Sequence, residues 1–191
     1  MRKYILLLLV LCGGDFCHCG HRKPVSVSPS GGAGRGGRGS GDAARLDDGL
    51  EGMINQYRKL SGLPPVTHSA ALRRVAEAHA HDLAERHPEN GCGGNLHSWS
   101  NRGKWKGGCY APNDSATWPL MWLKPREIAG DSRYGYEIVC KGAPTPALSL
   151  DCWRASRPHH DVILNRGMWT QAWSGMGAAI YGGYAVAWFE R

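Results

Sequence analysis

The spacing of apolar residues predicts an amphipathic helix where the folded part of the chain begins. Its apolar positions recur at three- and four-residue intervals, which place them on one helical face: Leu50, Met53, Ile54 and Tyr57. We expect Asp47 or Asp48 to cap the start of this helix. The segment Gly62-Leu-Pro-Pro65 should end it, because proline has no backbone N–H for a helix interior.

A second amphipathic helix is predicted from Ser69, whose hydroxyl is a suitable N-cap, to about Arg86. Its apolar face holds Leu72, Val75, Ala76, His79 and Leu83. His79 therefore lies on the face that turns toward the core. A single histidine in that position is more often a hydrogen-bonded core residue than a ligand of a functional site.

Residues 88–146 are rich in glycine, proline, asparagine and tryptophan and show little periodicity, so we expect loops and short strands there. Residues 134–139 form one candidate strand. Thr145 and Pro146 are a typical N-cap and first-turn pair for a third helix, which should end near Arg157-Pro158. On that helix Leu148, Cys152 and Ala155 share one face.

The clearest hairpin signal is Gly182-Gly183, which separates the apolar runs 177–181 and 184–189. Helices come first, loops follow and an antiparallel pair of strands comes last. This order predicts an α+β fold in which helices pack on an antiparallel sheet.

The first 46 residues have a different character. Arg2 and Lys3 precede a short apolar run, Tyr4 to Cys12, and two glycines follow, which is typical of a secretory signal peptide. We assign residues 1–20 to this leader, 21–46 to a glycine-, arginine- and serine-rich linker, and 47–191 to one folded domain. The apolar run is too short to span a bilayer as a helix. A lipid-anchored form through Cys12 is the lesser alternative, because a large residue precedes this cysteine.

Charge agrees with export and argues against a nucleic-acid-binding domain. The chain has 191 residues and a formal net charge of +7, but residues 1–46 carry seven lysines and arginines against two aspartates. The folded part is therefore nearly neutral. Gly34-Arg-Gly-Gly-Arg-Gly39 has the composition of an RNA-binding segment, yet an exported protein does not meet RNA. A linker that touches anionic wall or membrane polymers stays open as an alternative.

The seven cysteines fall into two groups. Three lie in or beside the leader, and four lie in the domain: Cys92, Cys109, Cys140 and Cys152. An even number in an exported domain indicates two disulfides, and we favour Cys92 with Cys109 and Cys140 with Cys152 because each pair closes a short loop. A structural zinc site is less favoured, since none of the spacings is Cys-x-x-Cys.

Several segments together resemble the CAP superfamily, also called the SCP domain, which includes cysteine-rich secretory proteins, insect venom antigens and plant pathogenesis-related proteins. Ile54-Asn-Gln-Tyr-Arg58 and His79-Ala-His-Asp82 are similar to its opening helices. Trp153-Arg-Ala-Ser156-Arg-Pro-His159, followed by Val162-Ile-Leu164 and the closing strands, is similar to its C-terminal part. The resemblance covers residues 47–191 and implies an α-β-α sandwich with a central antiparallel sheet.

The resemblance also implies a cleft with two histidines and two glutamates that takes a divalent metal in many members. Leu96-His97-Ser98 nominates His97, Tyr136-Glu137-Ile138 nominates Glu137, and the C-terminal segment nominates His159. Ser156 stands in the region where many relatives have the second glutamate. His160 is a second candidate beside His159, and an alternative register uses His87 but leaves Glu137 unexplained.

Two classes of function follow. The first is a secreted, monomeric, non-catalytic module that binds an extracellular sterol or other lipid, a glycan or a protein and needs no cofactor. The second is a metal-dependent hydrolase, because two neutral imidazoles and a carboxylate can hold zinc and leave one position for water; a weakly bound zinc ion is compatible with both. Trp99, Trp105 and Trp122 are candidate aromatics of a ligand groove, although we favour core filling and loop pinning as their role.

Overall fold

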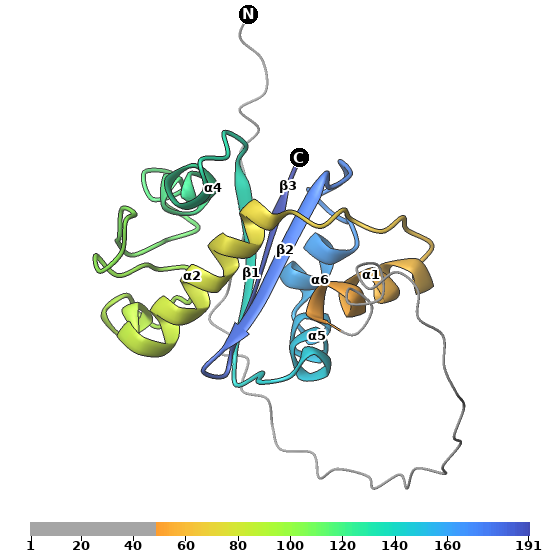
Figure 1. Cartoon of the computed structure of the whole chain (residues 1–191), viewed down its shortest axis with the longest axis horizontal. Coiled ribbons are helices and arrows are strands. Elements are labelled where there is room, and N and C mark those ends of the chain that lie inside the picture. Colours follow the sequence, from red (N-terminus) through yellow and green to blue (C-terminus); the bar gives the residue numbers. More distant parts are fainter. Residues whose placement is uncertain (1–48) are drawn as a thin grey trace, which may run out of the picture.

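A three-stranded antiparallel sheet divides the domain into two layers of helices. The computed structural model describes residues 49–191, so the predicted leader, the predicted linker and the expected caps Asp47 and Asp48 lie outside the described residues. The strands are β1 (Gly135–Lys141), β2 (Gly175–Tyr181) and β3 (Tyr184–Glu190), in the order β1-β3-β2. The predicted α+β class and the central antiparallel sheet are confirmed (Figure 1).

The predicted hairpin joins β2 to β3. Both glycines of its turn have positive φ, 55° at Gly182 and 82° at Gly183, a conformation that other residues adopt only with strain. On the other edge, β1 pairs with β3 so that Tyr136 lies opposite Phe189 and Glu137 opposite Trp188. Because side chains alternate along a strand, Tyr136 and Glu137 project into different layers.

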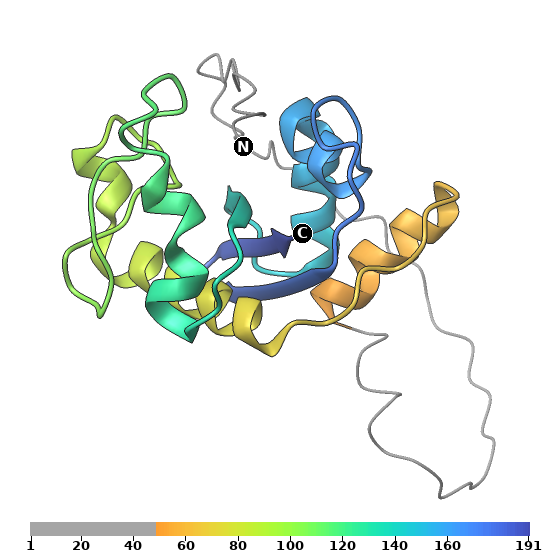
Figure 2. The ribbon, with the colours of Figure 1, turned by 90° about the horizontal axis from the view of Figure 1, so that it is seen from above.

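One layer consists of α1 (Leu50–Leu60), α5 (Pro146–Ala155) and α6 (Arg157–Ile163). The other consists of α2 (Ala70–Arg86), α3 (Pro119–Trp122) and α4 (Lys124–Ala129), with a 3₁₀ turn, η1, at Pro88–Gly91. Figures 1 and 2 show the two layers on opposite faces of the sheet. Each has its own buried cluster: one centres on Trp153 and Phe189, the other on Leu72 and Trp188. The arrangement is the α-β-α sandwich that the resemblance implies.

Close contact between α2 and β2 depends on Gly177. A Cβ atom at this position would lie 2.1 Å from the backbone nitrogen of Arg73 and 2.4 Å from the carbonyl carbon of Leu72. These are backbone atoms of the helix, so a rotamer change cannot relieve the overlap. Glycine here sets the distance between the helix and the sheet.

Most of the predicted helix boundaries are confirmed, and three details are wrong. Ser69 and Thr145 cap α2 and α5 through their side chains, and Gly62-Leu-Pro-Pro65 follows the end of α1. The N-cap of α1 is Gly49, without a side-chain hydrogen bond, and not Asp47 or Asp48. The third predicted helix, α5, ends at Ala155, and Arg157-Pro158 begins a further helix, α6, that was not predicted. Proline is well suited to a first helical turn.

The third correction concerns the buried face of α5. Leu148 is 42% exposed and Ala155 is also exposed, whereas Ser149, Cys152 and Trp153 are buried. The buried face of α5 is therefore rotated about the helix axis relative to the predicted face. Trp153 brings much more apolar area than Ala155, so its burial sets the orientation of the helix.

The structure contains both of the favoured disulfides. Cys92 pairs with Cys109, and Cys140 pairs with Cys152. The first pair ties the turn after η1 to the long loop that leads to α3, and the second ties the end of β1 to α5. Within residues 49–191, no helix has the length and apolar character needed to cross a membrane.

Candidate functional site

Glu137 is the centre of a buried polar cluster in the α2 layer. Its carboxylate accepts a hydrogen bond from Nδ1 of His97 at 2.7 Å through Oε2, and a second from Nδ1 of His79 through Oε1. Burial alone would raise the pKa of Glu137. The charge and hydrogen bond of His79, together with those of His97, outweigh it and lower that pKa to about 2. Glu137 is thus an ionised carboxylate with both oxygens occupied.

His79 lies on the inner face of α2, and both of its ring nitrogens face acceptors. Nδ1 faces the Glu137 carboxylate, and Nε2 lies 3.1 Å from the backbone oxygen of Ser98. Neither oxygen can donate, so the ring form with a proton on both nitrogens is the one that satisfies both contacts. The ring also stacks on Trp99, with a centroid separation of 3.8 Å and an interplanar angle of 8°. His79 and Glu137 therefore form a buried ion pair.

Trp99 is also held in place by a second neighbour, Lys124. The buried Lys124 places Nζ 5.2 Å from the centroid of the Trp99 ring and donates to the backbone oxygen of Lys106 and to Glu127, each at 2.6 Å. Burial lowers the pKa of Lys124, and the Glu127 carboxylate opposes that effect. This lysine ties the loop before α3 to the indole that covers His79.

His97 comes from the loop after α2. Its backbone N–H donates to Oδ1 of Asn95 at 2.9 Å, which holds the loop in place. The imidazole edge faces Tyr110 at 5.6 Å and His159 at 6.4 Å between ring centroids. Its side chain is 18% exposed, so His97 connects the buried ion pair to the surface.

His159 reaches the cluster from α6, in the opposite layer. Its Nδ1 atom is enclosed and has no hydrogen-bond partner within the described residues. Burial, with a smaller contribution from the neighbouring His97, lowers the pKa of His159 to about 3. The ring is therefore neutral at physiological pH. The structure brings His97 and Glu137 into direct contact and places His159 beside them without a bond to either.

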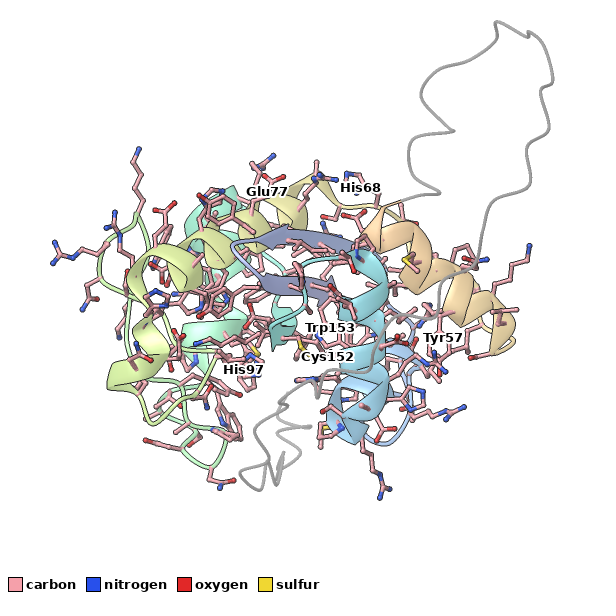
Figure 3. All side chains as sticks on the ribbon, turned by 90° about the horizontal axis from the view of Figure 1, so that it is seen from below. Tyr57, His68, Glu77, His97, Cys152 and Trp153 are labelled. Carbon is pink, nitrogen blue, oxygen red and sulfur yellow. A yellow bond between two sulfur atoms is a disulfide. The ribbon has the colours of Figure 1, made fainter. Side chains whose placement is uncertain are left out.

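The other histidines that the sequence raised lie elsewhere. Nε2 of His160 is hydrogen-bonded at 2.7 Å to the hydroxyl of Tyr57, on the α1 side of the domain. Figure 3 shows Tyr57 far from His97. His87 lies 3.3 Å from the hydroxyl of Tyr184 and near Glu89. Neither is hydrogen-bonded to Glu137, whereas His97 is.

The cluster does not fit a resident metal ion. Zinc sites in proteins have three or four protein ligands. Here both oxygens of Glu137 are engaged by imidazole N–H groups, which leaves only the imidazoles of His97 and His159 as donors. Among residues 49–191, no group of three or more histidine, cysteine, aspartate or glutamate side chains is arranged to hold a metal.

The tryptophans do not form one groove. Trp99 is 2% exposed and belongs to the core, in contact with Trp105 and Trp188. Trp105 donates to the backbone oxygen of Ser100 at 3.0 Å. Trp122 packs against Trp118 and Tyr134 on α3 and the segment before β1. Core filling, the favoured interpretation, describes Trp99, because the stacked His79 holds it in the interior.

A surface pocket of about 260 Å³ lies on the outer side of α2. Its walls are residues of α2, including Glu77, His81 and Glu85, together with Arg102 and Trp105. None of the residues of the histidine cluster lines it. The structure confirms the prediction that His79 is a hydrogen-bonded core residue on the buried face of α2. The sequence did not indicate that Glu137 is its partner.

The comparisons with known proteins identify a family and several solved structures with a similar fold. The model of the cysteine-rich secretory protein family, CAP, matches residues 51–168. Among solved structures, an extracellular protein containing an SCP domain from Bacillus anthracis has 17% sequence identity and a TM-score of 0.51, over 74% of this chain and 39% of that chain. An outer surface protein from Borrelia burgdorferi has 16% identity and a TM-score of 0.50, over 74% of this chain and 89% of that chain.

A cysteine-rich secretory protein from Staphylococcus aureus is also similar, with 15% identity and a TM-score of 0.46 over 74% of this chain. The chain spans 36% of the length of this protein and 39% of that of the Bacillus protein. No curated protein matches the sequence.

Proposed function

The chain belongs to the CAP family of cysteine-rich secretory proteins, and on that premise we propose that it works outside the cytoplasm as a binding module. Its ligand is an extracellular lipid such as a sterol, a glycan or a protein, the range that the family resemblance implies. In this proposal the histidine–glutamate cluster supports the fold and does not catalyse a reaction.

The observation that carries the proposal is the enclosure of Glu137. A hydrolase of the kind considered above needs this carboxylate either as a zinc ligand or as a general base for water. Both roles require an oxygen that a metal ion or water can reach. The Glu137 side chain is fully buried, and each of its oxygens already accepts a hydrogen bond, from His79 or from His97. These three side chains instead have the properties of a structural polar network.

Export is supported by three independent features. Residues 1–20 have the order of a secretory leader, two disulfides join the four cysteines of the domain, and disulfides persist in oxidising compartments. Two similar solved structures are described as an extracellular and an outer surface protein. We expect a secreted protein, with a lipid-anchored surface form as the alternative.

Hydrolysis assays test the non-catalytic part of the proposal. Ester and peptide substrates are incubated with the wild type and with Glu137→Gln, with and without added zinc, and circular dichroism verifies that the variant is folded. Both proteins should hydrolyse at the rate of the buffer alone. A wild-type rate above buffer that the folded variant has lost would overturn the proposal.

Zinc titration examines the cluster itself. Zinc offered in solution should bind weakly, because only His97 and His159 present free imidazole donors, and it should bind through the neutral imidazoles. His97→Ala and His159→Ala should each reduce zinc binding. Tight binding that survives both substitutions would show that the metal site lies elsewhere and uses other ligands.

A further inference from the structure

Three aromatic rings pack against one another in the layer opposite Glu137, and we call the group of Tyr136, Trp169 and Trp173 the aromatic cup. Tyr136 comes from β1, and Trp169 and Trp173 come from the segment that joins α6 to β2. Their ring centroids are separated by 5.1 Å between Tyr136 and Trp169 and by 5.6 Å for each of the other two pairs. The interplanar angles of 72°, 45° and 42° show that the rings are tilted against one another and not stacked.

A cation of the chain itself occupies this cup. The guanidinium carbon of Arg191 lies 5.3 Å from the ring centroid of Tyr136, 5.6 Å from that of Trp169 and 5.1 Å from that of Trp173. All three distances are within the range of cation–π attraction. Figure 2 shows the end of the chain between β1 and the blue segment that follows α6.

The rings are held in position before any ligand arrives. Trp173 is 6% exposed, and its indole N–H donates to the backbone oxygen of Val162 at 2.8 Å. The side chain of Asn165 donates to the backbone oxygen of Trp169 at 2.9 Å and accepts from the buried Arg58 at 2.8 Å. A cup that is already ordered loses little conformational entropy on binding.

The guanidinium of Arg191 is held much more weakly than the rings. Arg191 is exposed, and within residues 49–191 its side chain makes, besides the ring contacts, a 3.2 Å hydrogen bond to Oε1 of Gln171. None of the ion pairs among these described residues involves Arg191. Cation–π contacts at exposed sites are weak. A competing cation can therefore displace this side chain into solvent.

We propose that Tyr136, Trp169 and Trp173 bind a quaternary ammonium group of the choline type, with Arg191 as an internal plug that the ligand displaces. A quaternary ammonium ion carries charge without hydrogen-bond donors, so rings that offer only π faces satisfy it completely. The site lies on the other side of the sheet from the histidine cluster. It goes beyond the function proposed above and does not depend on the outcome of the hydrolysis assays.

The direct test is tryptophan fluorescence titration of the full chain with choline chloride. Its uncharged carbon isostere, 3,3-dimethylbutan-1-ol, separates cation recognition from apolar contact. Choline should change the fluorescence saturably and the isostere should not. Arg191→Ala should raise the affinity for choline by about fivefold, which corresponds to removal of about 1 kcal/mol of competition. Trp169→Leu should abolish binding.

Tyr134→Ala is the matched control, because Tyr134 is a more exposed aromatic outside the cup and its loss should leave choline binding unchanged. The Arg191→Ala titration keeps the test decisive even if Trp169→Leu does not fold. Absence of choline binding in both the wild type and Arg191→Ala, or equal binding of choline and its isostere, would overturn the proposal.

Two sources of the same chemical group are distinguished by a second set of titrations. Vesicles of phosphatidylcholine, compared with vesicles of phosphatidylglycerol, present the group on a membrane surface, and phosphocholine presents it in solution. If the protein binds phosphatidylcholine vesicles and Trp169→Leu abolishes that binding, the ligand is a lipid headgroup. Binding to choline and phosphocholine without vesicle binding would assign a soluble ligand.

Discussion

Glu137 and His79 form an ion pair between the middle of β1 and the inner face of α2, and neither side chain is exposed to solvent. Removing two charges from water costs several kcal/mol per ion, and hydrogen bonds must offset that cost. The remaining oxygen of Glu137 bonds to His97, and the remaining nitrogen of His79 faces the Ser98 oxygen. The pair therefore connects α2, β1 and the loop after α2 at one point.

The neutral state of His159 predicts a pH-dependent stability. Its pKa is lowered to about 3 in the folded protein, while an unfolded histidine titrates near 6.5. Between these values the unfolded chain binds more protons, so stability must fall as the pH falls, by up to about 1.4 kcal/mol per pH unit for one group. Urea unfolding of wild type and His159→Gln between pH 7 and pH 5 measures this.

In that window the wild type should lose more stability than His159→Gln. Glu137 does not disturb the comparison, because its folded pKa of about 2 and its ordinary value near 4.5 both lie below pH 5. If the free energy of unfolding changed equally with pH in the two proteins, His159 would not have a lowered pKa in the folded state.

The close approach of α2 and β2 predicts that Gly177→Ala is strongly destabilising. The added methyl group would overlap backbone atoms of Leu72 and Arg73, and overpacking typically costs about 1–3 kcal/mol. Gly91→Ala is the control, since a Cβ there meets nothing within 4 Å and the φ of Gly91 is not positive. Thermal unfolding should separate the two variants clearly; similar melting temperatures would contradict the close contact.

The disulfides predict that the folded domain contains no free thiol among Cys92, Cys109, Cys140 and Cys152. Thiol labelling of residues 49–191 under denaturing, non-reducing conditions should modify none of them. Replacing Cys92 and Cys109 together by serine should cost about 3 kcal/mol, because the loop of 17 residues gains freedom in the unfolded chain. Two labelled thiols, or no loss of stability in the double variant, would contradict this.

The fold was largely predictable because its main signals are local. The apolar face of α1, the caps Ser69 and Thr145, and Gly182-Gly183 each act over a few residues, and the structure confirms them. The start of α6 was missed because proline both ends one helix and begins another. The orientation of α5 was missed because it depends on how Trp153 packs against other elements.

The site was only partly predictable, because its members meet through tertiary contacts. Sequence motifs nominated His97, Glu137 and His159, yet they did not show that Glu137 is shared between two histidines. His79 is 58 residues from Glu137 in the sequence, and a histidine on a helix face carries no sign of its partner. The choice between His159 and His160 depends on how α6 is oriented, which neighbouring residues in a sequence do not reveal.

The central claim is that Glu137 supports the fold as the acceptor for two histidines. Its most direct test is the free energy of unfolding of Glu137→Gln in urea at pH 7. Glu77→Gln is the control, because the Glu77 carboxylate is half exposed and pairs with Arg73 one turn away. Glu137→Gln should lose about 3–5 kcal/mol, and Glu77→Gln less than about 0.5 kcal/mol. Equal stability of Glu137→Gln and wild type would contradict the account.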